Sequence, residues 1–261
     1  MKRALLATLC LVAFAGVASA QQEVTGIDLH FRGSFDANSK PTIGPLSTAV
    51  NTTAYSNIDN FLGQGLANGG AALSAGNTIT RLVADDITPA GVYTGLNVNL
   101  LTFSVANFNA AATTARARVR FFAADGVSGG PGTIVAAFSF NPIAFPVGVS
   151  LWSFNPAGAM LMPAGSFWAG VTFDNNTGTT GATAATLNNL GQGLFDPPTV
   201  GSSLDLFFRT TAAGSFAASN PVGAFFNLAA NPNANMGWAF DVEAPVPAVP
   251  STWGRVKSLF R

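Results

Sequence analysis

The sequence has little charge, one cysteine and one histidine. Of its 261 residues, 12 are Lys or Arg and 12 are Asp or Glu, so charged residues make up only 9% of the chain. Such a small, balanced set of charges does not provide the basic surface that binding to nucleic acid requires. A single Cys excludes a disulfide framework and a multi-thiolate metal site. A single His excludes most zinc sites and leaves few candidate catalytic bases.

Apolar and turn-forming residues take the place of charge. Hydrophobic residues make up 48% of the chain, which contains 22 Phe, 4 Trp, 28 Gly and 15 Pro. Low charge together with 11% aromatic residues is the opposite of a disordered composition. The sequence therefore predicts a folded protein whose stability depends on core packing.

Residues 1–20 have the pattern of a secretory signal peptide. Lys2 and Arg3 precede an apolar stretch over 4–17, and residues 18–20 form an A-x-A cleavage site. The apolar stretch is too short for a comfortable membrane span of about 20 residues, whereas a membrane anchor would need a longer one. We expect a secreted or cell-surface protein whose mature chain has no transmembrane span and no cysteine, because Cys10 leaves with the signal.

Apolar residues alternate with others along several segments, which is the pattern of half-buried β-strands. The clearest case is 115–123, where one face carries Ala115, Ala117, Val119, Phe121 and Ala123. Residues 167–173 and 236–242 alternate in the same way, and the second places Trp238 in the core. A change of phase between Leu100 and Leu101 predicts a bulge or corner. Further strands are expected over 24–35, 78–87, 133–140, 143–154, 203–209 and 222–228.

Many short strands separated by Gly, Pro and Asn turns predict a single all-β domain over 21–243, a two-sheet, jelly-roll-like β-sandwich. A parallel β-solenoid is the alternative, but it should show a regular repeat. The nearest approach to a repeat is NFLGQGL at 60–66 and NLGQGL at 189–194. These echoes are interpreted as matching loops at one end of the sandwich, or as chance.

The composition changes after residue 243. The domain over 21–243 carries seven basic and 12 acidic residues, whereas 244–261 is a Pro-rich linker with a basic tail. Within the tail, Pro250, Ser251, Thr252 and Trp253 precede Arg255, Lys257 and Arg261.

This tail resembles the sorting signal of secreted bacterial PEP-CTERM proteins, which ends in an apolar span and an Arg cluster. The kinds of residues in the segments 84–87, 120–126 and 235–240 are also similar to those of these proteins. The resemblance implies a β-sandwich of the cell surface or extracellular matrix. Val249 stands where the signal has Glu, and the apolar span is missing. The tail is therefore a degenerate tag, a variant sorting signal or a plain basic end.

Two features suggest contact with a polysaccharide. Arg116, Arg118 and Arg120 share one face of the strand over 115–123, where guanidinium groups could bind carboxylate or sulfate oxygens. Trp168 stands among small neighbours and could be an exposed stacking platform for a sugar ring. The alternative for the arginines is a solvated face with Asp partners on neighbouring strands.

Adjacent Asp85 and Asp86 form the best candidate metal site, for a structural calcium ion, because neighbouring carboxylates repel unless a cation lies between them. Ordinary turn chemistry explains the other Asp residues near turns, and no twelve-residue calcium loop is present.

The function expected from these features is that of a non-enzymatic protein of a bacterial surface or extracellular matrix. A carbohydrate-binding module for an extracellular polysaccharide is the first alternative, and it requires an exposed Trp168 beside the arginines. A glycoside hydrolase is the second, and it requires two carboxylates in one cleft, from among Asp174, Asp205 and Asp241. Envelope components are further possible partners.

Overall fold

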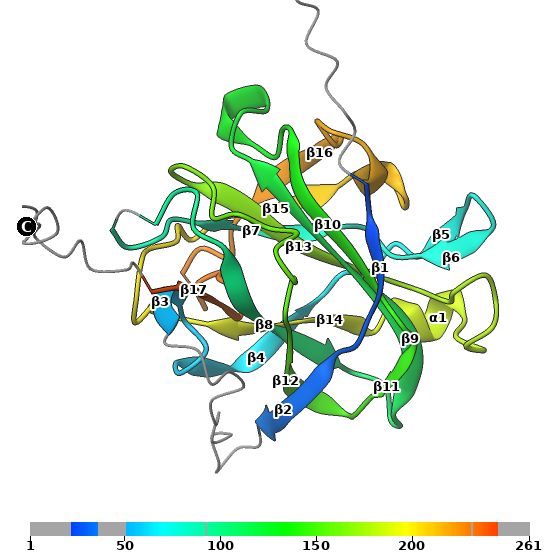
Figure 1. The fold of residues 1–261 in the computed structure, drawn as a ribbon. Helices are drawn as coiled ribbons and strands as arrows, with labels where there is room; N and C mark the ends of the chain where they lie inside the picture. The colour runs from blue at the N-terminus through cyan, green and yellow to red at the C-terminus, as the bar shows by residue number, and fades with distance from the viewer. Residues whose placement is uncertain (1–21, 36–50, 92, 231, 245–261) are drawn as a thin grey trace, which may run out of the picture.

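The computed structural model describes residues 22–35, 51–91, 93–230 and 232–244. Two β-sheets pack against each other and form a β-sandwich, as the alternation pattern predicted (Figure 1). The predicted signal peptide, Cys10, and all of the predicted tail except Ala244 lie outside the described residues.

The first sheet contains the strand order β1-β10-β9-β13-β7-β15-β16, with β5, β6 and β11 attached to it. Its strands are β1 (Val24–Ile27), β5 (Ala72–Ser74), β6 (Asn77–Ile79), β7 (Val83–Ile87), β9 (Thr113–Ala123), β10 (Ile134–Phe140), β11 (Ile143–Phe145), β13 (Phe167–Asp174), β15 (Phe207–Thr210) and β16 (Gly223–Phe226).

The second sheet contains the order β2-β12-β8-β14-β4, with β17 paired to both β3 and β8. Its strands are β2 (His30–Phe35), β3 (Asn51–Ser56), β4 (Phe61–Ala67), β8 (Val98–Asn107), β12 (Gly148–Phe154), β14 (Leu190–Phe195) and β17 (Trp238–Glu243). The helical segments described are three short ones: η1 (Val127–Gly129), α1 (Ala184–Leu187) and η2 (Ser215–Ala217).

The predicted alternation places the core between the sheets. Ala115, Ala117, Val119 and Phe121 of β9 are fully buried there. Phe121 meets the ring of Trp238 at 5.8 Å and that of Phe240 at 5.7 Å between ring centres, edge to face. This is a favoured aromatic geometry, and each fully buried ring of this size contributes about 1.5–3 kcal/mol. The prediction that Trp238 belongs to the core is confirmed.

Three segments that were predicted as single strands are broken. Residues 24–35 form β1 and β2, which pair in different sheets: β1 runs parallel to β10, and β2 antiparallel to β12. Residues 143–154 likewise form β11 and β12, and residues 78–87 enclose the end of β6 and all of β7. In the first two cases the chain passes from one sheet to the other, whereas β6 and β7 both pair with β13 in the first sheet. An apolar run in the sequence does not reveal either kind of break.

The two echoing segments are strands, not loops. Residues 61–67 and 190–195 are β4 and β14, which pair antiparallel with each other, and Gly65 lies opposite Gly193. A Cβ atom on Gly65 would lie 2.9 Å from the Gln192 carbonyl oxygen, so the close approach of the strands requires glycine here. The predicted bulge near Leu100 is confirmed: the pairing of β8 with β17 shifts register between Val98 and Leu100.

Candidate functional site

The three arginines lie along the outer face of β9 and all form ion pairs. Arg116 Nε is 2.9 Å from Asp174 Oδ1, and Arg118 Nε is 2.7 Å from Asp174 Oδ2. Asp174 is fully buried and lies directly across from Arg116 on β13. Arg120 Nη2 is 2.9 Å from Glu23 Oε1. Arg116 and Arg118 therefore have the Asp partner on a neighbouring strand that the alternative interpretation of the sequence expected.

Phe216 of η2 covers part of the stripe. The guanidinium carbon of Arg120 is 5.1 Å from the centre of the Phe216 ring, and that of Arg118 is 5.9 Å from it. Burial lowers the pKa of Arg120, an effect that the Glu23 carboxylate opposes. The guanidinium groups thus connect the sheet to its covering segments.

Trp168 lies on the same outer face as the arginines, but the expectation that it is exposed is wrong. Only 3% of its surface is accessible. Its ring packs against Phe208 and Phe225, with centres 6.3 and 5.7 Å away, and its indole Nε1 donates a hydrogen bond to the Gly129 carbonyl at 2.9 Å. The segment around η1 and strand β16 therefore cover the Trp168 ring, which the sequence had suggested as a stacking platform for a sugar.

One edge of Trp168 reaches a surface pocket of about 500 Å³, which we call the Asp86 pocket. It combines two aromatic rings, several hydroxyl groups and one carboxyl group. Its lining consists of Asp86, Thr88, Ala124, Ser128, Gly129, Ser166, Trp168, Ser202, Ser203, Leu204, Leu206 and Phe225. Phe225 is 36% exposed, so this ring is the accessible aromatic surface of the pocket. The sequence predicted a strand over 222–228 but not the role of Phe225.

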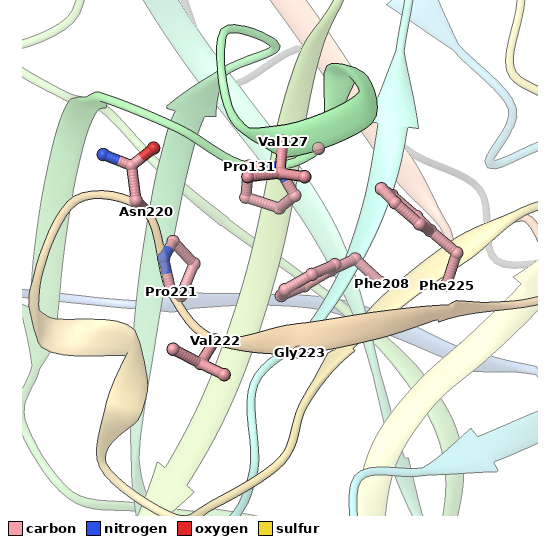
Figure 2. Close-up of a pocket in the computed structure, with 9 residues that line it drawn as sticks. Val127, Pro131, Phe208, Asn220, Pro221, Val222, Gly223 and Phe225 are labelled. Carbon is pink, nitrogen blue, oxygen red and sulfur yellow. The ribbon is translucent and has the colours of Figure 1, made fainter.

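A second pocket, of about 300 Å³, adjoins the first and shares Phe225 with it. We call it the Pro221 pocket. Figure 2 shows Val127 and Pro131 on one side, Asn220 to Val222 on the other, and Phe208 with Phe225 beside them. The two pockets together extend over the outer face of the first sheet.

Asp85 and Asp86 lie on β7, across from Ala169 and Trp168 of β13. Asp85 is fully buried, and its Oδ2 accepts a hydrogen bond from the Met236 N–H at 2.8 Å. Both oxygens of Asp86 accept from the Leu204 N–H at 3.1 Å. Burial raises the pKa of Asp85 well above its ordinary value, and Asp86 adds to this effect. Burial also raises the pKa of Asp86 to about 6.

The three Asp residues considered for hydrolysis each have other partners. Asp174 pairs with Arg116 and Arg118, and Asp241 of β17 accepts a hydrogen bond from Thr53 Oγ1 at 2.7 Å. Asp205 accepts from the N–H groups of Ala230 and Ala234, at 2.8 and 2.7 Å. These contacts organise strands and loops.

Comparison of the chain with protein-family models, curated proteins and solved structures gave no match. Among the described residues, no helix has the length and apolar character needed to cross a membrane. Within the same residues, no group of three or more His, Cys, Asp and Glu side chains could hold a metal ion. Any cation at Asp85 and Asp86 would therefore need neutral oxygen ligands as well.

Proposed function

We propose that this chain is an exported, non-enzymatic protein of a bacterial surface or extracellular matrix that binds a neutral polysaccharide in the Asp86 pocket. The observation that carries the proposal is the lining of this pocket, in which the accessible ring of Phe225 adjoins hydroxyl groups and a carboxyl group. A sugar residue offers matching chemistry, because its ring has an apolar face and a rim of hydroxyl groups.

The charge of the lining favours an uncharged ligand. Asp86 is its one ionisable side chain, and it carries no Lys, Arg or His. The arginine stripe, which the sequence suggested for an anionic polysaccharide, is already paired with Asp174 and Glu23. A neutral glycan therefore fits this face better than a sulfated or uronic-acid polymer.

Two further observations support the rest of the proposal. Export and a surface or matrix location follow from the signal-like residues 1–20 and from the resemblance to PEP-CTERM proteins. A non-enzymatic role is favoured because Asp174, Asp205 and Asp241 each serve a structural contact.

Binding to a panel of soluble neutral and acidic polysaccharides, measured by affinity electrophoresis, tests the pocket. Phe225→Ala should weaken binding to a neutral polymer about tenfold or more, because it removes the accessible ring. Phe226→Ala is the matched control: this Phe is 46% exposed on the same strand but packs on Phe207, outside the pocket. Equal binding by both variants, or retention of the wild type by acidic polymers alone, contradicts the proposal.

The location is tested separately by fractionating cells that produce the full chain or a chain ending at residue 243. Retention at the surface should require residues 244–261 if they act as a sorting tail. Identical partitioning of the two chains would remove the sorting role without bearing on the pocket.

A further inference from the structure

Arg81 and Arg209 are a pair of cations without a carboxylate partner. Arg209 lies on β15, and Arg81 lies just before β7, the strand beside β15 in the first sheet. Neither forms an ion pair with a described Asp or Glu, in contrast to the three arginines of β9. The Arg209 guanidinium group donates one hydrogen bond, from Nη2 to the Asn68 carbonyl at 2.7 Å, whereas that of Arg81 donates none to a described residue.

The two guanidinium groups also repel each other. Burial lowers the pKa of Arg209, and the positive charge of Arg81 lowers this pKa further. Both side chains nevertheless keep their protons, because the ordinary pKa of arginine lies above about 12. The pair therefore holds two positive charges that the described protein does not neutralise.

The turn that follows β4 is shaped around these two side chains. Gly69 and Gly70 have φ angles of +62° and +58°, a conformation that residues with a side chain rarely adopt. A Cβ atom on Gly69 would lie 2.7 Å from Arg209 Nη2, and one on Gly70 would lie 2.5 Å from Arg81 Nε. Glycine at both positions lets the backbone approach closely, so the two arginine side chains lie against adjacent residues of one turn.

The backbone of the same turn adds two more donors. The N–H groups on either side, of Asn68 and Ala71, bind acceptors in the segment 188–190. Those of Gly69 and Gly70 have no acceptor among the described residues. Gly70 is exposed and Gly69 is half-buried, so a solute can reach the turn. Two guanidinium groups and two backbone N–H groups thus present donors at one accessible place.

Donors gathered in this way are the chemistry of an anion site. Guanidinium groups match the oxygens of carboxylates, phosphates and sulfates, and successive backbone N–H groups form concavities that bind anions. A planar carboxylate has only two oxygens. A tetrahedral phosphate or sulfate group presents three or four in different directions, which suits donors that come from two strands and a turn.

We propose that Arg81, Arg209 and the Gly69–Gly70 turn bind a phosphate or sulfate group. The site lies where the chain leaving β4 of the second sheet meets β7 and β15 of the first, since Arg209 binds the Asn68 carbonyl and the Arg81 N–H binds that of Gly69 at 3.1 Å. It shares no residue with the Asp86 pocket and does not depend on the proposed glycan.

Calorimetric titration of the full chain with sodium phosphate and with sodium sulfate tests the site. We expect one ion per chain with a Kd of about 1 mM or below. In about 20 mM phosphate, Tm should rise by about 3–7 °C relative to sodium chloride of equal ionic strength. A sugar phosphomonoester distinguishes the two sources of this chemistry: its binding supports a site for groups carried by larger molecules, and binding of the inorganic ions alone supports a site for the free ion.

Variants assign the donors. Arg81→Gln should weaken phosphate binding at least tenfold, yet leave Tm in sodium chloride within about 2 °C of the wild type, because the Arg81 guanidinium group bonds to no described residue. Arg209→Gln should weaken binding equally, and Arg81→Gln carries the test if loss of the contact with Asn68 impairs folding.

Arg32→Gln is the matched control. It removes the same charge from β2, which lies at the opposite edge of the second sheet from β4. This variant should bind phosphate like the wild type. Absence of a rise in Tm specific to phosphate or sulfate, wild-type affinity in Arg81→Gln, or equal weakening in Arg32→Gln overturns the proposal.

Discussion

The two faces of the first sheet are both buried, but by different means. The inner face of β9 and β13 meets the second sheet through rings and aliphatic groups such as Phe121, Phe167 and Val171. The outer face carries Trp168, the arginine stripe and Asp86, and is covered by loops. Sheet-on-sheet burial needs no polar partners, whereas burial under loops requires that each polar group be paired. The inner face thus provides stability, and the outer face holds the two pockets.

Phe121 and Phe122 offer the sharpest test of this difference, since they are adjacent, fully buried and on opposite faces of β9. Phe121→Ala should lower the free energy of unfolding by about 4 kcal/mol, because the two sheets cannot close over the cavity. Phe122→Ala should cost about 2–3 kcal/mol, because the covering loops can relax. Denaturant unfolding measures both values. A larger cost for Phe122→Ala would reverse the comparison.

The ion pairs of the outer face should give the next largest effect. Asp174→Asn should destabilise the protein by about 3 kcal/mol, because Arg116 and Arg118 both lose the carboxylate they contact. Asp28→Asn is the control, since this exposed carboxyl accepts a long hydrogen bond from Asn141, at 3.3 Å; it should change stability by less than about 0.5 kcal/mol. Thermal unfolding of the two variants side by side decides the point, and equal stabilities would mean that the stripe contributes nothing.

The smallest effect is expected at the loop that covers Trp168. Trp168→Phe retains a ring but removes the hydrogen bond from indole Nε1 to the Gly129 carbonyl, at a cost of about 1 kcal/mol. Amide exchange should accelerate over 126–132 and stay unchanged in β8 and β17, because the opening is local. Acceleration throughout both sheets would show that the two faces form one cooperative unit.

The sequence predicted the inner face well. In β9 and β13 the inward set was identified residue by residue, because small and large apolar residues alternate with polar ones or glycine. Strands β4 and β14 were missed as strands, since glycines such as Gly65 and Gly193 carry no side chain that could show an alternation.

The outer face was beyond the reach of the same reasoning. Alternation set the arginines apart from the apolar face of β9, and Trp168 apart from that of β13, and the structure brings the two sets together on one face of the sheet. Alternation carries no information about what covers that face. The neighbours of Asp85, such as Ser203 and Tyr55, come from distant segments. Their meeting depends on the course of loops, which no local pattern encodes.

The pairing of the first two strands has a consequence for the order of assembly. Strands β1 and β2 each form one edge of a sheet, and their partners β10 and β12 lie beyond residue 130. Neither β1 nor β2 can pair until the middle of the chain has been made, and pairing over such a distance in the sequence carries a large entropic cost of loop closure. The first two strands of a polypeptide with this connectivity therefore remain unpaired during synthesis until β10 and β12 have been made.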